Sequence, residues 1–195
     1  NPSLSEKVTI SFLVPNPAHV TTTIYDPSHM HIIDLEKDSA VEPGMHTISW
    51  DGRDKFGQEV PEEAYYFTVQ LVYENGRQVS YNPAFSGGQY LGIISTKCSP
   101  EENKVNYSIP VPARVRIRAG VKEGPLHRTL LDWAPRLAGT HTLQWNGKDN
   151  SNTQTLWNRE GFLLTASAFA LPQHSILVRG NNLDYFSYWT ARSEK

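Results

Sequence analysis

Two histidines with the spacing of metal ligands stand at His29 and His31. Alternate residues of a strand point to the same side, so both imidazoles can face one ion, and imidazole nitrogens are common zinc ligands. Two ligands do not complete a metal site, and the sequence places no third ligand nearby. His29 and His31 are therefore metal candidates only, beside the alternative of an exposed hairpin turn, and no metal is predicted.

Three carboxylates, those of Asp51, Asp54 and Glu59, lie in one loop. Carboxylate oxygens bind calcium, but this spacing lacks the alternating carboxylates of a dedicated calcium loop. A structural interpretation is favoured, in which the Asp54 side chain accepts hydrogen bonds from amides of its own turn.

No motif for catalysis is present in the sequence: there is no nucleophile elbow, metalloprotease helix or phosphate-binding loop. The carboxylate pairs at residues 62–63 and 101–102 are adjacent in loops, so their side chains point apart. The single cysteine, Cys98, excludes an internal disulfide and a cysteine-based zinc site. We predict that the chain is not an enzyme and that it has no catalytic residue and no cofactor.

Three arginines, Arg114, Arg116 and Arg118, alternate with apolar residues. In a strand the apolar set faces the core, and the three guanidinium groups line one solvent-facing side. An ordinary soluble sheet face is the commoner case, but like charges at this spacing repel one another unless they are paired. The three arginines are therefore candidate interface residues for an acidic partner or for the acidic half of the chain.

Aromatic residues gather at Trp133, at Trp157 and in residues 185–189, which are interpreted as a strand. Exposed aromatic side chains fit a protein interface or a platform for stacking sugars. Core packing explains Trp157 least, because it lies in a long loop. Trp133 and Trp157 are candidate interface residues, and a protein is favoured over a carbohydrate as the partner.

The elements that must position these residues are short strands. Thirteen glycines, 13 prolines and many aromatic and β-branched residues are typical of an all-β chain with frequent turns. No segment shows helical periodicity. Alternating apolar residues predict strands at residues 8–15, 19–25, 30–35, 46–50, 65–73, 78–81 and 90–95.

A segment at residues 44–54 returns 95 residues later at residues 139–149. Each copy runs from an alternating strand into a buried tryptophan, a tight glycine turn and a carboxylate. Further matches at the same spacing, up to Tyr90 and Tyr185, predict two tandem domains of residues 1–99 and 100–195. The signature residues are Trp50, Gly52, Asp54, Trp145, Gly147 and Asp149.

The first copy resembles the immunoglobulin-like domain named after the bacterial flagellar hook-capping protein, the FlgD type. The resemblance rests on residues 17–21, 24–26, 44–54, 56–61 and 64–67. It implies a fibronectin-like β-sandwich, used as an add-on module in secreted and envelope proteins and, in the hook-capping protein, in a non-enzymatic assembly scaffold. The second copy has diverged, because residues 150–158 replace the Gly-x-x-Val-Pro loop of the family.

Charge divides the chain. Residues 1–99 carry 6 Lys+Arg against 12 Asp+Glu, and residues 100–195 carry 12 against 8. Opposite signs favour docking of the two halves or binding of different partners. No basic run is dense enough to indicate nucleic acid, and the longest apolar run, at residues 162–171, is too short for membrane insertion.

The sequence therefore predicts an all-β chain of two tandem immunoglobulin- or fibronectin-like β-sandwiches, the first acidic and the second basic. We expect a non-enzymatic structural or interaction module that binds other protein subunits. Its expected setting is an accessory or scaffold subunit of a larger extracytoplasmic bacterial assembly, periplasmic, on the cell surface or secreted after removal of a signal peptide. The alternatives are a carbohydrate-binding module and an appended domain of a longer secreted enzyme.

Overall fold

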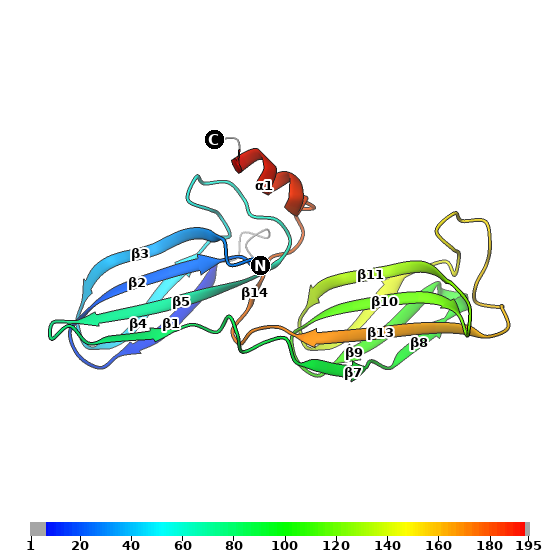
Figure 1. The fold of residues 1–195 in the computed structure, drawn as a ribbon, viewed down its shortest axis with the longest axis horizontal. Helices are drawn as coiled ribbons and strands as arrows, with labels where there is room; N and C mark the ends of the chain where they lie inside the picture. The colour runs from blue at the N-terminus through cyan, green and yellow to red at the C-terminus, as the bar shows by residue number, and fades with distance from the viewer. Residues whose placement is uncertain (1–6, 194–195) are drawn as a thin grey trace. The chain divides into compact units, whose positions relative to one another are not determined.

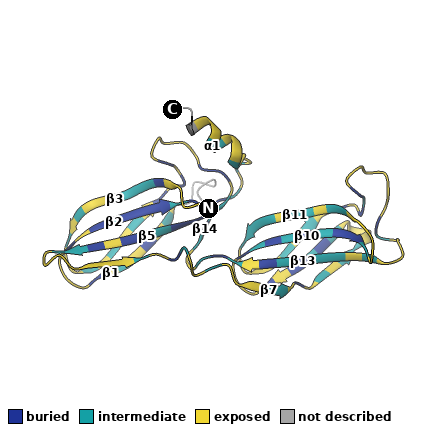
Figure 2. Ribbon diagram, viewed as in Figure 1, coloured by how far each residue is buried: buried dark blue, intermediate teal, exposed yellow. Residues whose placement is uncertain are grey.

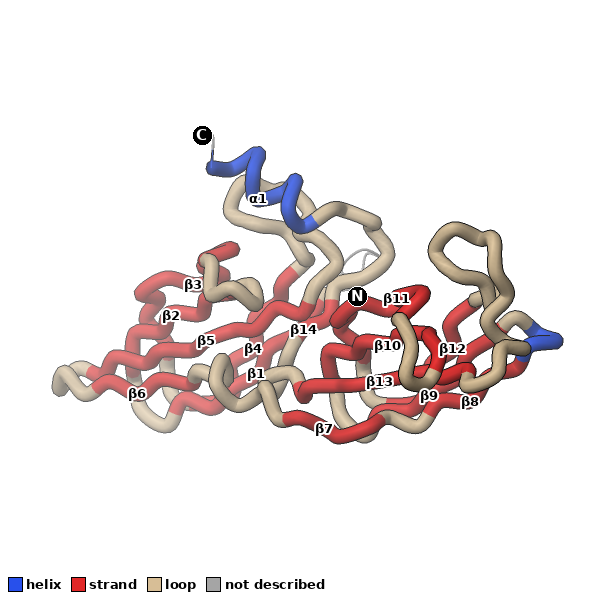
Figure 3. Tube along the Cα trace, turned by 45° about the vertical axis from the view of Figure 1, so that its right-hand side comes forward, coloured by secondary structure: helices blue, strands red, loops and turns tan. Residues whose placement is uncertain are grey.

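The structure is a computed structural model that describes residues 7–193. Within those residues nearly all regular structure is β-strand (Figures 1 and 3), and one α-helix, α1 (Tyr185–Ser193), follows the last strand. The all-β class predicted from the alternating pattern is confirmed.

The chain forms two compact units. The first unit contains Asn1–Ser86 together with Pro172–Lys195, and the second unit contains Gly87–Leu171. The second unit is thus inserted into the sequence of the first, and the chain passes twice between them. The first unit is acidic, with 8 Lys+Arg against 14 Asp+Glu, and the second is basic, with 10 against 6.

The first unit has two antiparallel sheets. One pairs β1 (Val8–Val14) with β4 (Gly44–Trp50), so that Val8 lies opposite Trp50. The other is centred on β2 and β5, and both β6 and β14 add to β5. Its strands are β3 (His31–Val41), β2 (Ala18–Tyr25), β5 (Ala64–Tyr73), β6 (Gln78–Tyr81) and β14 (Ile176–Leu177).

The second unit also has two antiparallel sheets. The larger runs in the order β11 (Leu126–Arg136), β10 (Ala113–Val121), β13 (Phe162–Ala170) and β7 (Tyr90–Ile93). The smaller runs in the order β12 (Gly139–Gln144), β9 (Lys104–Ile109) and β8 (Thr96–Ser99), and the short 3₁₀ turn η2 (Pro100–Glu102) joins β8 to β9.

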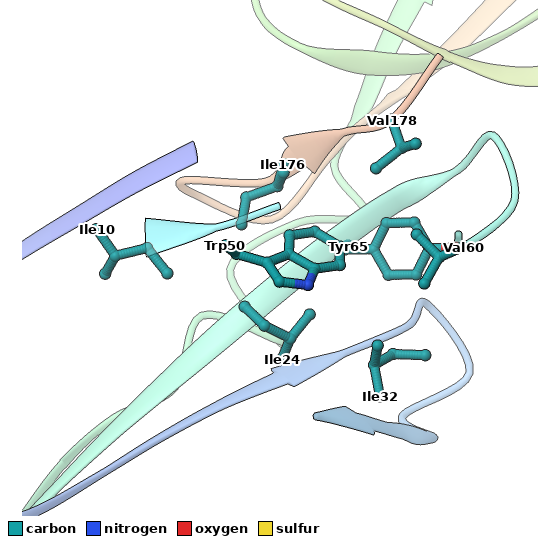
Figure 4. Close-up of a cluster of buried hydrophobic side chains, with 8 residues drawn as sticks. All are labelled: Ile10, Ile24, Ile32, Trp50, Val60, Tyr65, Ile176 and Val178. Atoms are coloured by element: carbon teal, nitrogen blue, oxygen red, sulfur yellow. The ribbon is translucent and has the colours of Figure 1, made fainter. Parts of the chain in front are cut away.

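Trp50 is at the centre of the first core (Figure 4). It is 1% exposed and its ring centroid lies 5.4 Å from that of Tyr65. Ile10 from β1, Ile24 from β2 and Ile176 from β14 point into the same cluster. Large aromatic side chains contribute most to cores of this size, so Trp50 joins strands from both sheets.

Strict alternation along β10 builds the core of the second unit (Figure 2). Val115, Ile117 and Ala119 are fully buried, whereas the arginines between them are only partly buried. Successive side chains of a strand point to opposite faces, so burying one set places the other on the outer face of the sheet.

The domain boundary expected near residue 99 differs from the observed units. The strand expected to close the first domain is β7, which pairs with β13 of the second unit. The segment Ile176–Leu177, expected in the second domain, pairs with β5 of the first. Alternation of apolar residues identifies a strand and its buried face, but it does not show which sheet the strand joins. The repeat spacing therefore assigned both segments to the unit with which they do not pair.

The segment at residues 185–189, interpreted as a strand, is the start of α1. The Asp184 side chain accepts a hydrogen bond from the Ser187 amide at 2.7 Å, which is a helix N-cap. Tyr185, Tyr188 and Trp189 are spaced by three and four residues and share one helical face. The prediction that no segment is helical is therefore wrong for these residues. The match of Tyr90 with Tyr185 does not reflect equivalent structure, because Tyr90 lies in a strand and Tyr185 in a helix.

Candidate functional site: an arginine–aromatic face on the second unit

The three arginines of β10 lie on the outer face of the larger sheet of the second unit. In the antiparallel register, Arg114 is opposite Phe169, Arg116 opposite Ser167 and Arg118 opposite Thr165 of β13. Residues opposite one another in a sheet share a face, so the arginine side chains and alternate residues of β13 form one surface.

Trp133 is brought to this surface by an irregularity in β11. Its φ is 47°, and the pairing of β10 with β11 shifts register between Val115 and Ile117. A bulge of this kind redirects side chains at a strand. The Trp133 ring centroid lies 5.5 Å from the guanidinium carbon of Arg116, and Arg114 donates a hydrogen bond to the Trp133 carbonyl at 3.2 Å.

Aromatic and aliphatic side chains extend the surface across β13 and β7. The Phe169 ring lies 5.3 Å from the Trp133 ring and 5.3 Å from the Tyr90 ring. Ile93 of β7, opposite Ser167, is 89% exposed. We call this surface the arginine–aromatic face; its residues are Arg114, Arg116, Arg118, Trp133, Phe169, Tyr90 and Ile93.

Positive charge on this face is only partly neutralised. The Arg116 Nε lies 3.3 Å from the Asp132 carboxylate, which is 68% exposed. Among residues 7–193 the Arg118 guanidinium has no hydrogen-bond or ion-pair partner. Guanidinium groups bind carboxylates through paired hydrogen bonds, so the face suits a partner that carries carboxylates.

Trp157, the other aromatic candidate, lies elsewhere on the unit. Its ring centroid is 4.4 Å from that of Trp145 and 5.8 Å from that of Phe162, and its side chain is half-buried. Phe162 begins β13, whereas Phe169 is near its end. The structure therefore groups Trp133 with the arginines but places Trp157 against the core, and a role of Trp157 in an interface stays a prediction.

The repeated signature forms the same loop in both units. The indole N–H of Trp50 donates to the Arg53 carbonyl at 2.7 Å, and that of Trp145 donates to the Lys148 carbonyl at 2.8 Å. Gly52 and Gly147 have φ values of 76° and 75°, and this left-handed region carries no Cβ clash for glycine.

The carboxylates of the signature accept hydrogen bonds from turn amides. The Asp54 Oδ1 accepts from the amides of Phe56 and Gln58, at 2.8 and 3.0 Å. In the second unit the Asp149 Oδ1 accepts from the amides of Thr153 and Gln154, at 2.9 and 3.3 Å. Partial desolvation acts to raise the Asp149 pKa, but these hydrogen bonds outweigh it and hold the pKa below its usual value.

The remaining carboxylates of the calcium hypothesis have protein partners too. Asp51 accepts from the Arg53 amide at 3.1 Å, and Glu59 lies 3.3 Å from the Arg53 guanidinium. Each has a structural role in the loop that does not require an ion.

The two candidate metal ligands contact different residues. His29 lies in the turn before β3, with a φ of 63°, and its Nδ1 is 2.7 Å from the Tyr66 hydroxyl. His31 opens β3 and its Nε2 is 2.9 Å from the Asp34 carboxylate. The strand geometry expected for the pair is therefore wrong. Within residues 7–193 no three His, Cys, Asp or Glu side chains gather as a metal site requires.

Tyr90, Ile93 and Phe169 are parts of the face that the sequence pattern did not indicate. The repeat spacing assigned Tyr90 and Ile93 to the first domain, and Phe169 lies in the mostly apolar run of residues 162–171, in which Thr165 and Ser167 are the polar residues. Phe169 stands two residues after Ser167, and this period of two was the signal for a shared outer face.

Comparisons with known proteins place the chain only loosely. No model of a known protein family matches it, and no curated protein matches it. Among solved structures, FlgD from P. aeruginosa is 18% identical over 53% of this chain and 74% of that chain, with a TM-score of 0.35. The BSP domain of a biofilm associated protein is 12% identical over 92% of this chain and 28% of that chain, with a TM-score of 0.25. Neither likeness assigns a family.

Helices long and apolar enough to cross a membrane are absent from residues 7–193.

Proposed function

We propose that the chain is a non-enzymatic protein-interaction module whose second unit binds an acidic protein partner through the arginine–aromatic face. The observation that carries the proposal is the joint exposure of apolar and cationic side chains on one face of a sheet. Tyr90, Phe169 and Ile93 are 50%, 38% and 89% exposed beside the three arginines. Exposed apolar side chains that gather on one surface are typical of binding sites.

The composition of the face suits a protein partner. Arginine and aromatic residues are enriched at the energetic centres of protein interfaces. The Arg114 and Arg116 side chains are already oriented by Trp133, so less conformational entropy is lost when they bind. The second unit carries a net positive charge, which favours association with an acidic surface.

A carbohydrate partner is less well supported by the same geometry. The rings of Tyr90 and Trp133 are inclined to the Phe169 ring by 46° and 54°, so the three rings do not form one flat platform. Trp157, the other candidate for sugar stacking, packs against Trp145. We keep glycan binding as an outcome of the test.

The setting that we propose is an accessory or scaffold subunit of a larger extracytoplasmic assembly. The support is the resemblance of residues 17–67 to FlgD-type modules, which belong to secreted and envelope proteins. The two signature loops, with equivalent hydrogen bonds around Trp50 and Trp145, support the interpretation that the units are diverged copies of one such module.

Site-specific photo-crosslinking tests the proposal. A photoreactive residue at Ile93 reports contacts of the face, and one at Ser108, exposed on β9 of the other sheet, is the positional control. Incubation with cell-envelope extract is expected to give a protein adduct from position 93 and not from position 108. Adducts from both positions at equal yield, or retention on a glycan array in place of a protein adduct, would refute it.

A charge variant sharpens the test. Arg118→Glu reverses a charge on the face, and Lys97→Glu makes the same change on β8 of the other sheet. We expect Arg118→Glu to reduce the adduct yield about tenfold, in line with a lost charge contact of roughly 1.4 kcal/mol. Lys97→Glu leaves the yield within about twofold, because only the net charge changes.

A further inference from the structure

In the described part of the chain, strand β1 has a partner strand along one edge only. It pairs with β4, and within residues 7–193 no strand pairs with its other edge. An unpaired edge leaves a row of backbone amides and carbonyls available for hydrogen bonds with another strand.

The second unit shows how an equivalent edge is covered. Its β9 is the strand equivalent to β1. The Asn103 carbonyl, just before β9, accepts a hydrogen bond from the Trp145 amide, and Val8 of β1 lies opposite Trp50 in the same way. On the far edge of β9 lies β8, with Lys97 opposite Asn106 and Cys98 opposite Val105. The first unit has a strand equivalent to β9 but, in its described part, none equivalent to β8.

A hollow lies beside β1 in the described part of the first unit. Two adjoining cavities of about 300 and 380 Å³ share Ser11, Phe67 and His174 as lining residues. Leu13 and Val79, which line the first cavity, are 64% and 40% exposed. No Asp, Glu, Lys or Arg lines either cavity, so the groove suits apolar side chains.

Burial along this edge differs between the described parts of the two units. Tyr107 on β9 is 2% exposed, whereas Phe12, at the equivalent place on β1, is only partly buried. In the second unit Ile94 lies just before β8 and packs into the core with 7% exposure. The groove of the first unit has room for an aliphatic residue in the same role.

We infer that the first unit binds an extended segment of a partner protein, which adds to the free edge of β1 and inserts aliphatic side chains at alternate positions into the groove. Addition of a strand to an open sheet edge is a common mode of peptide recognition. The acidic balance of the unit, 8 Lys+Arg against 14 Asp+Glu, favours basic residues at the solvent-facing positions of the segment. Lys97 of β8 is exposed in that way.

The test uses the full chain and a synthetic peptide with the sequence of residues 92–99, in which serine replaces the cysteine. Hydrogen–deuterium exchange is measured with and without peptide at about 1 mM, a concentration that detects even weak binding. We expect slower exchange of the amides in Val8–Val14. The same peptide with proline at the position of Lys97 is expected to give no protection, because proline disfavours strand pairing.

Two matched variants locate the site. Leu13 and Met45 lie opposite one another on β1 and β4 and are 64% and 68% exposed, but only Leu13 lines the groove. Leu13→Lys is expected to weaken peptide binding about tenfold, and Met45→Lys to leave it within about twofold. Absence of protection in the wild-type chain, or equal weakening by both variants, would overturn the proposal. So would a dimer that Leu13→Lys converts to a monomer, since the occupant would then be a second copy.

Discussion

At the residue scale, Gly147 is required by the packing of Trp157. A Cβ at Gly147 would overlap the Trp157 indole, and its φ of 75° already disfavours other residues. Gly161 has a similar φ of 73°, but a Cβ there would meet Lys122 at an ordinary 3.6 Å.

We predict that Gly147→Ala lowers the free energy of unfolding by about 3 kcal/mol, from backbone strain and overpacking together. Gly161→Ala, which adds strain alone, is expected to cost about 1 kcal/mol. Urea denaturation followed by tryptophan fluorescence measures both variants. Equal losses would contradict the packing of Trp157 on Gly147.

The Asp54 carboxylate is also needed for stability. It is 2% exposed, and it accepts hydrogen bonds from two turn amides and from the Tyr188 hydroxyl. Asp54→Ala is expected to lower the free energy of unfolding by about 2–4 kcal/mol, because buried donors lose their acceptor. The control Asp51→Ala removes an exposed acceptor and is expected to cost about 0.5 kcal/mol. Thermal denaturation measures the stability of both variants. An Asp54→Ala protein as stable as the Asp51→Ala control would contradict a stabilising role of the Asp54 hydrogen bonds.

Residue roles set by local turn chemistry were readable from the sequence. Trp50, Gly52 and Asp54 follow from a short stretch whose turn needs those residue types. The aromatic neighbours of Phe169, which are Trp133 and Tyr90, come from strands distant in the sequence, and no local pattern specifies them. The arginine stripe and Trp133 were therefore candidates from the sequence, but Tyr90, Ile93 and Phe169 were not.

At the element scale, α1 docks on the first unit through its tyrosines. The Tyr188 hydroxyl donates to the Asp54 carboxylate at 2.7 Å, and the Tyr185 hydroxyl donates to the Asp26 carboxylate. Trp189 packs against the core cluster around Trp50. This end of the unit therefore buries two carboxylates beneath a helix.

Alkaline pH is expected to weaken this docking. Burial raises the Tyr188 pKa above its ordinary value, and the Asp26 carboxylate and the Tyr185 phenol raise it further. In the unfolded chain the Tyr188 phenol ionises near pH 10, whereas in the folded chain it stays neutral at that pH. Its contribution to the free energy of unfolding is therefore complete below about pH 10 and is lost as the pH rises above that value.

Tyr188→Phe tests this at pH 7 and across an alkaline pH range. At pH 7 the variant is expected to lose about 1 kcal/mol with the hydrogen bond to Asp54. Between pH 9 and 11, a range around the ordinary tyrosine pKa, its stability should fall less steeply than that of the wild type. The other buried tyrosines titrate in both proteins. Parallel profiles of stability against pH would therefore show that Tyr188 does not contribute to the loss of stability at alkaline pH.

Most strands could be predicted from alternation, with ends that differ by a few residues; β3 runs on to Val41, beyond the predicted residue 35. The helix α1 was missed because its aromatic residues also fit a strand. The Asp184 cap and the aromatic spacing of three and four are short signals, and contact with the first unit, rather than periodicity, stabilises so short a helix.

At the scale of the whole molecule, the observed units predict which fragments fold. The ends of the second unit are joined by hydrogen bonds, from the Gly88 amide to the Ala170 carbonyl and from the Ala170 amide to the Gln89 carbonyl, both at 2.8 Å. A fragment of residues 87–171 is expected to unfold cooperatively, because it keeps both sheets complete.

A fragment of residues 100–195, the domain expected from the repeat, is the matched control. It lacks β7 and β8 and is expected to show no cooperative transition by circular dichroism. Cooperative unfolding of both fragments would favour the boundary at residue 99. The repeat located the boundary only approximately, because an edge strand shows the same alternation of apolar residues whichever unit it pairs with.

The central claim, that the second unit binds an acidic protein through the arginine–aromatic face, is tested most directly by competition. The fragment of residues 87–171 is added to the crosslinking reaction of the full chain labelled at position 93. We predict that the wild-type fragment abolishes the protein adduct, and that the Arg118→Glu fragment needs about tenfold more to do so. An adduct that neither fragment reduces, or that both reduce equally, would contradict the claim.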